Sequence, residues 1–146
     1  MSSVTNRITI LRPIEDVFAV LTDVEKTEIW FPWDVRERWT TPPPHGVGST
    51  RHAVVQMRGS RSENDATVTE YDPPFRAAMR GTSPNAPFVA TLVFGHDGHA
   101  TLVEITTQFI FRGASRIAGP LFAAWYGRAW ARGLVTLKRL MESGEL

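Results

Sequence analysis

The feature that most constrains the fold is a change of hydrophobic period near Gly113. Between Gly48 and Phe111, short runs of alternating apolar and polar residues are typical of β-strands. After Gly113, apolar residues recur every three or four positions, which is typical of one amphipathic helix. This helical stripe consists of Phe122, Tyr126, Ala129, Trp130, Gly133, Leu137 and Leu140. The sequence therefore predicts a sheet followed by one long C-terminal helix.

Short linkers between the apolar runs predict how the strands pair. The predicted strands are Val4–Leu11, Asp34–Thr41, Ser49–Met57, Ser62–Tyr71, Phe75–Gly81, Phe88–Phe94 and Ala100–Phe111. Most linkers are too short for a parallel crossover, which needs about a dozen residues or more, so the strands are expected to be antiparallel. Asp97-Gly98 is the strongest hairpin signal in the chain.

Helical segments are predicted between the first two strands and at the C-terminal end. Pro13 precedes Glu15 and Asp16, a combination that suits the first turn of a helix. A second helical turn is expected over Asp23–Ile29, with Asp23 as its cap. Pro120 is predicted to mark the first turn of the main helix, after a looser turn from Ser115, and Gly144 to end it. The fold class is therefore α+β, as a single domain over residues 1–146.

Composition excludes several classes of function. The chain contains sixteen Lys and Arg and fifteen Asp and Glu. It therefore lacks the excess of basic residues that is expected of a dedicated nucleic-acid binder. The absence of cysteine excludes thiolate catalysis, cysteine zinc sites and disulfides. None of the four histidines has the spacing of a helical metal pair, and no metal or cofactor is expected. With neither a secretory signal nor an apolar run of about 20 residues, we expect a cytoplasmic protein without a membrane span.

The predicted architecture implies a cavity. Seven antiparallel strands twist and curl, which gives the sheet one concave face. A helix is about 10–12 Å wide and cannot fill such a face from edge to edge. Small residues in the helical stripe, Ala129 and Gly133, leave further space beside the bulky ones. We therefore expect an open space between helix and sheet.

Several motifs, in this order, resemble landmarks of the START-like superfamily, which includes polyketide cyclases/dehydrases and lipid-transfer domains. They are Pro13-x-x-x-Val17-Phe18-x-x-Leu21-Thr22-Asp23 with Trp30, Gly46-x-Gly48, Thr69-Glu70-Tyr71-Asp72-Pro73-Pro74, and the helix end Leu137-Lys138-Arg139-Leu140-Met141-Glu142. The resemblance covers nearly the whole chain. It implies the helix-grip fold: a curved seven-stranded antiparallel sheet around the C-terminal helix, two short helices between strands 1 and 2, and a deep hydrophobic cavity that opens near those helices.

Candidate ligand-binding residues follow from strand parity, the helical stripe and this resemblance. They are Trp39, Met57, Met79, Phe88, Phe94, Phe109, Phe122, Tyr126 and Trp130, with Trp30 at the entrance and His52 on a strand. Trp33 is interpreted as packing the short helices onto the sheet. Glu37 shares its parity with Val35 and Trp39, which makes it the best candidate for a carboxylate inside the cavity. No catalytic residue is assigned.

The leading hypothesis is a non-catalytic protein that binds or transports a hydrophobic small molecule: a lipid, a fatty acyl group, or a polyketide or other aromatic metabolite. The second is a polyketide cyclase, aromatase or dehydratase in which His52, Glu37 or Tyr126 moves protons. A cluster of polar groups deep in the cavity with perturbed pKa values would favour the second. The third is a protein-interaction module. Either a monomer or a homodimer is compatible with the sequence.

Overall fold

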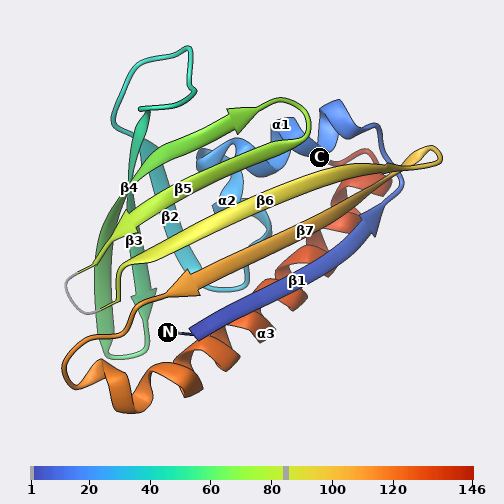
Figure 1. Cartoon of the computed structure of the whole chain (residues 1–146). Helices are drawn as coiled ribbons and strands as arrows, with labels where there is room; N and C mark the ends of the chain where they lie inside the picture. The colour runs from blue at the N-terminus through green and yellow to red at the C-terminus, as the bar shows by residue number, and fades with distance from the viewer. Residues whose placement is uncertain (1, 84–85) are drawn as a thin grey trace.

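The computed structural model describes residues 2–83 and 86–146 (Figure 1). Its helical elements are α1 (Ile14–Thr22), the 3₁₀ turn η1 (Val24–Lys26), α2 (Thr27–Trp30) and α3 (Ser115–Glu142). The strands are β1 (Ser2–Ile10), β2 (Asp34–Trp39), β3 (Thr50–Met57), β4 (Ser60–Asp72), β5 (Arg76–Thr82), β6 (Phe88–Asp97) and β7 (Ala100–Phe109). The predicted α+β fold, with short helices between the first two strands, is confirmed.

All seven strands form one antiparallel sheet in the order β1-β7-β6-β5-β4-β3-β2. The predicted hairpin at Asp97-Gly98 joins β6 to β7, where Gly98 adopts a φ of 61° that suits glycine in a tight turn. A register shift between Val68 and Glu70 interrupts the β4–β5 pairing, as a β-bulge does, and increases the local twist. The curved sheet lies along α3, which runs beside β1 (Figure 1).

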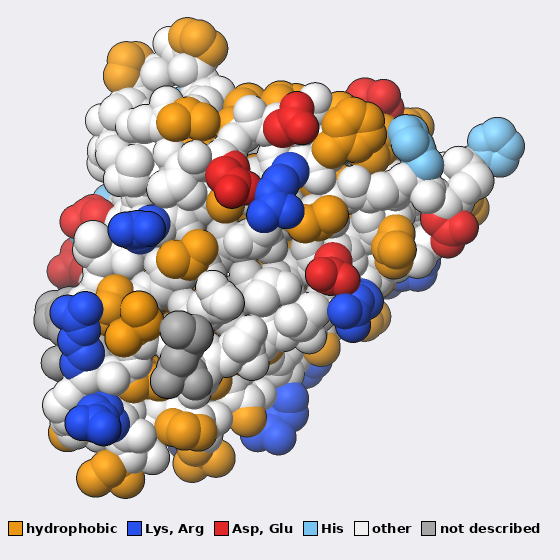
Figure 2. Space-filling view, in the orientation of Figure 1, with side chains coloured by type: hydrophobic (Ala, Val, Ile, Leu, Met, Phe, Trp, Pro, Cys, Tyr) orange, Lys and Arg blue, Asp and Glu red, His pale blue; other side chains and the backbone are white. Residues whose placement is uncertain are grey.

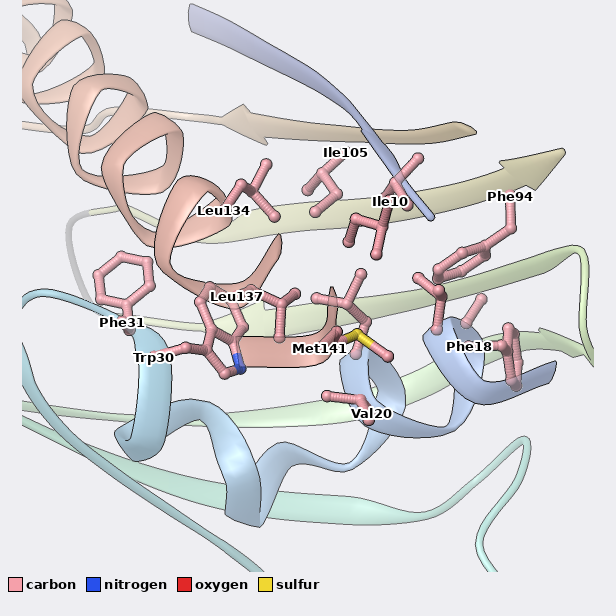
Figure 3. Close-up of a cluster of buried hydrophobic side chains, with 14 of the residues drawn as sticks. Ile10, Phe18, Val20, Trp30, Phe31, Phe94, Ile105, Leu134, Leu137 and Met141 are labelled. Atoms are coloured by element: carbon pink, nitrogen blue, oxygen red, sulfur yellow. The ribbon is translucent and has the colours of Figure 1, made fainter. Parts of the chain in front are cut away.

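The C-terminal half of α3 holds the hydrophobic core. Leu134, Leu137 and Met141 are at most 1% exposed and pack in a cluster with Ile10 of β1 and with residues of α1 (Figure 3). The i, i+3, i+4 and i+7 spacing of such residues places them on one face of the helix. This half of the helix is therefore fixed to the sheet and to α1 by buried apolar side chains.

Polar contacts tie the same end of α3 to the end of β1 and to the loop that follows it. The Glu142 carboxylate accepts a hydrogen bond from the Leu11 backbone N–H at 2.8 Å. Arg12 donates to the Met141 carbonyl at 2.6 Å, which satisfies one of the last carbonyls of the helix. Lys138 donates to the Thr9 carbonyl at 2.6 Å. The end of the helix is thus held by hydrogen bonds as well as by burial.

The prediction for Pro120 is wrong. Helix α3 begins at Ser115 and continues through Pro120, which lies inside it rather than in its first turn. Proline has no N–H to donate to the carbonyl four residues earlier, which here is that of Arg116. Arg116 is exposed, so water can satisfy this carbonyl. Asp23, in contrast, caps η1 as predicted by accepting from the Glu25 N–H at 3.1 Å.

Candidate functional site

A cavity of about 1090 Å³ lies between the N-terminal half of α3 and the concave face of the sheet. Its floor consists of inward-facing residues of β2 to β7, and its other walls come from α1, η1, α2 and α3. The predicted residues that line it are Trp30, Trp39, Met57, Met79, Phe88, Phe109, Phe122, Tyr126 and Trp130. The structure thus brings together most of the predicted ligand-binding residues around one space.

Aromatic rings form one side of the cavity. Phe109 of β7 packs edge-on against Phe122 and Tyr126 of α3, with ring centroids 5.8 and 5.1 Å apart. Trp33 lies 4.8 Å from Trp125 and 5.9 Å from Tyr126. Such tilted and edge-to-face arrangements are the favoured geometry of aromatic pairs. The rings present an apolar wall along the whole helix side.

Trp30 is part of the inner wall and not of the entrance, contrary to the prediction. It is 3% exposed and packs against Trp130 with ring centroids 5.3 Å apart. It also lies close to Gly133 of α3, where a Cβ would come within 3.2 Å of the indole. Trp33 was predicted only to pack the short helices onto the sheet. In the structure it packs on Trp125 of α3 and also lines the cavity.

His52 and Phe94 do not line the cavity. His52 lies on the outer face of β3, where its ring nitrogens contact Asp65 at 2.7 Å and Glu63 at 3.1 Å. The inward positions of β3 are instead Arg51, Ala53, Val55 and Met57, so the parity that includes His52 points outward. Phe94 does face inward, but α1 covers its end of β6 and its ring packs 5.1 Å from that of Phe18. Both predictions are therefore corrected.

A polar cluster interrupts the apolar lining on the β2–β3 side. Arg51 Nε lies 2.8 Å from Glu37 Oε2, and the two side chains are only 6% and 12% exposed. The N–H is not aligned for a hydrogen bond, so this contact is an ion pair. Arg51 Nη1 also donates to the backbone carbonyl of Asn64 at 3.2 Å and to its side-chain oxygen. The prediction of a carboxylate at Glu37 inside the cavity fits this placement.

Burial raises the pKa of two groups at this site. Removal from water raises the pKa of the Glu37 carboxyl, and the positive charge of Arg51 partly opposes this rise. Burial likewise raises the pKa of the Tyr126 hydroxyl, while the neighbouring Trp130 and Thr107 act in the opposite direction. Glu37, Arg51 and Tyr126 all line the cavity. At neutral pH Tyr126 keeps its proton and can donate a hydrogen bond into the cavity.

The orientation of Arg51 was open from the sequence alone, and Asn64 had no predicted role. The signal for Arg51 was its parity with Ala53, Val55 and Met57, three apolar residues of the same strand. Its charge argued against burial, because an arginine is almost never fully buried unless it is paired. The partner, Glu37, lies on the neighbouring strand, and the pairing became visible only with the register that sets Glu37 opposite Ala53.

The described residues hold no group of three histidine, cysteine, aspartate or glutamate side chains that could bind a metal ion. Of the helices in residues 2–83 and 86–146, none is both long and apolar enough to cross a membrane.

Comparison with known proteins places these features in a family. A model of the family described as polyketide cyclase/dehydrase and lipid transport matches residues 1–142. The uncharacterized protein Rv2574 of Mycobacterium tuberculosis is 28% identical over 106 residues, which make up 73% of this chain and 60% of that protein. The chain thus spans less than two thirds of the length of this relative.

Solved structures share the fold. TTHA0849 from Thermus thermophilus superimposes with a TM-score of 0.78 at 16% identity, over 99% of this chain and 100% of that one. DynU16, a protein from the dynemicin biosynthetic locus, gives a TM-score of 0.70 at 18% identity over 99% of this chain and 48% of that one. At these identities the likeness shows the fold alone. The family match over residues 1–142 confirms the resemblance predicted from the motifs, and the chain belongs to the polyketide cyclase/dehydrase and lipid transport family.

Proposed function

We propose that the cavity binds an apolar small molecule that carries a neutral oxygen group, such as a ketone, a phenol or an alcohol. The observation that carries this proposal is the buried Glu37–Arg51 pair, which lines the cavity together with Tyr126 among mostly apolar side chains. Ligand sites typically combine apolar walls with a few polar groups that fix the orientation of the ligand. The aromatic wall would hold the body of the molecule, and the cluster would hold its oxygen.

The charge of the cluster favours a neutral ligand. Arg51 is already paired with Glu37 and bonded to Asn64, so its positive charge is compensated. A ligand carboxylate at the same place would lie beside the carboxylate of Glu37, and like charges in contact cost several kcal/mol. A ketone can instead accept a hydrogen bond from Tyr126, and an alcohol can donate one to Glu37.

Cavity size and family membership support the same class of ligand. About 1090 Å³ lies slightly above the usual volume of ligand pockets, roughly 300–1000 Å³, and leaves room for a large ligand. The family description names polyketides and lipids, and the fold neighbour DynU16 comes from a biosynthetic locus. A polyketide combines a large apolar body with ketone and hydroxyl groups. It therefore suits both parts of the cavity.

Displacement of an environment-sensitive fluorescent probe tests this proposal. We expect a long-chain alcohol or a polycyclic phenol to bind at least about tenfold more tightly than the fatty acid of the same length, because of the carboxylate of Glu37. Ala90→Trp should weaken binding at least about tenfold, since Ala90 of β6 lines the cavity and an indole there would project into the space that the ligand occupies. The matched control is Val93→Trp on the outer face of the same strand, where the residue is 37% exposed. Equal affinity for acid and alcohol, or normal binding by Ala90→Trp, would contradict the proposal.

A second candidate function is proton-transfer catalysis on such a ligand in the same cavity. It is favoured by one observation: the cavity brings together a carboxylate with a raised pKa and a protonated tyrosine. Glu37 would remove a proton from a carbon between two ketones, and Tyr126 would stabilise the resulting enolate oxygen with a hydrogen bond. This is the chemistry that cyclisation of a polyketide chain requires.

Glu37→Gln separates binding from catalysis once a thermal melt shows that the variant, which leaves Arg51 without its partner, is folded. For a catalyst, product formation from a poly-β-ketone should fall about 10²- to 10⁴-fold, the usual contribution of a general base. Loss of one hydrogen bond to a ligand should weaken its binding no more than about tenfold. The control is Glu63→Gln, a carboxylate on the outer face beside His52. Mass spectrometry of the incubated compound measures both variants, and absence of any product with the wild-type protein rejects the catalytic candidate for that substrate.

A further inference from the structure

The outer face of the N-terminal half of α3 carries exposed apolar side chains next to the cavity. Ile117 is 90% exposed, Leu121 73% and Trp125 43%. Their spacing of four residues places them on one face of the helix, away from the core. Residues of the same turns, Ser115, Ala118, Gly119 and Phe122, line the cavity, and Trp125 belongs to both surfaces. The apolar face therefore lies along an edge of the cavity.

Arginines continue this face toward the C-terminus of α3. Arg128 lies three residues after Trp125, and Arg132 lies four residues after Arg128. Arg116 directly precedes Ile117. No acidic residue occurs between Glu104 and Glu142, whereas this interval contains six basic residues: Arg112, Arg116, Arg128, Arg132, Lys138 and Arg139. None of Arg116, Arg128 and Arg132 forms an ion pair with another described residue. Figure 2 shows hydrophobic and basic side chains, and no acidic ones of the described residues, along the lower edge where α3 begins.

We propose that this face, defined by Ile117, Leu121, Trp125, Arg128 and Arg132, docks the protein on an anionic lipid bilayer. A helix with apolar and aromatic side chains beside arginines is suited to lie in a membrane interface, with its apolar residues among the acyl chains and its cations at the phosphates. Each basic residue near such a surface strengthens binding roughly fivefold. Docked in this way, the cavity edge faces the lipid, so an apolar ligand can pass between bilayer and cavity without crossing water.

The same observations argue against a second copy of the chain on this face. A symmetric dimer places the same surface on both partners, so Arg128 and Arg132 of both copies would lie in one interface, and this face has no acidic residue to pair with them. Three exposed apolar side chains on one convex helix also provide little of the roughly 800 Å² that each partner buries in a stable protein interface. An anionic bilayer satisfies both the apolar residues and the charges, whatever the cavity binds.

Cosedimentation of the ligand-free protein with lipid vesicles tests the proposal. We expect binding to vesicles of phosphatidylcholine mixed with phosphatidylglycerol, weak binding to phosphatidylcholine alone, and a loss of binding as salt is raised, because salt screens exposed charges. The double variant Arg128→Gln/Arg132→Gln should bind roughly 25-fold more weakly. Ile117→Gln/Leu121→Gln should lose at least about tenfold, since it removes the apolar groups that enter the interface.

Controls keep this result separate from folding and from ligand binding. Leu102→Gln changes another exposed apolar residue, 43% exposed, on the outer face of the sheet and should bind vesicles normally. Ala90→Trp should also bind them normally, because it alters only the cavity. Ile117 and Leu121 are so exposed that their substitution leaves the fold intact, which a thermal melt verifies. Failure of the wild type to sediment with the mixed vesicles, equal binding by Ile117→Gln/Leu121→Gln, or a dimer that this variant dissociates would overturn the proposal.

Discussion

Arg51→Met should lower the free energy of unfolding by about 3–5 kcal/mol, the usual cost of removing one partner of a buried ion pair. The variant leaves the Glu37 carboxylate buried without a counterion, and neither side chain of the pair is more than 12% exposed. Methionine has a similar volume, so the loss arises from charge and not from a cavity. Urea denaturation at neutral pH, followed by circular dichroism, measures it.

The loss should depend on pH in a defined direction. Burial already raises the pKa of Glu37, and Arg51 opposes this rise, so its removal raises the pKa further. Between the ordinary value of 4.5 and the raised one, the folded protein holds a proton that the unfolded chain has released. Stability therefore falls as the pH rises through this window. Arg51→Met should be most destabilised near neutral pH and least near pH 4.5.

A double variant provides the control for charge. Arg51→Met/Glu37→Met replaces both members of the pair by apolar residues, which is often neutral or stabilising. It should recover most of the stability and lose the extra pH dependence. If the double variant is as unstable as Arg51→Met, the packing of the arginine and its bonds to Asn64 matter more than the ion pair does.

Leu137→Ala should lower the free energy of unfolding by about 2–5 kcal/mol, as expected for a large-to-small change in a packed core. Leu137 is fully buried and lies in the cluster that joins α3 to Ile10 and α1. The alanine removes buried methyl groups and leaves a void that the rigid neighbours fill only in part. Thermal and urea unfolding measure the change.

Val135→Ala is the matched control on the same helix. Val135 is 63% exposed, so its truncation should change stability by no more than about 0.5 kcal/mol. Alanine is the strongest helix former, so neither change costs helix propensity, and a similar loss in both variants would contradict the role of burial at Leu137. A small loss in Leu137→Ala alone would mean that the cluster does not anchor the helix.

The fold could be predicted from the sequence because its signals are local and repeated. The two hydrophobic periods identify the strands and the helix, and the short linkers require antiparallel pairing. The main error in the helix concerned Pro120, which is common in first turns but is tolerated here because the carbonyl it leaves free belongs to an exposed residue.

The site was predictable only in part, since it depends on contacts between distant residues. Strand parity gave the correct face for Met57, Met79, Phe88 and Phe109. Strand parity could not show that α1 covers the end of β6 at Phe94, because this depends on how the helix packs on the sheet. Likewise, the burial of Arg51 rather than His52 follows from a single step of register, which moves every side chain of a strand to the other face.

The N-terminal half of α3 lines the cavity, and its C-terminal half packs in the core. Substitutions that change the cavity therefore fall at other positions than substitutions that change stability. Substitutions at Phe122 or Tyr126 would reshape the cavity, while Leu134, Leu137 and Met141 would continue to hold the helix in place. Distant sites contribute to stability almost independently. A scaffold of this kind can acquire new ligand preferences at little cost in stability. That property would allow one architecture to serve proteins whose sequences share less than a fifth of their residues, as the comparison with TTHA0849 illustrates.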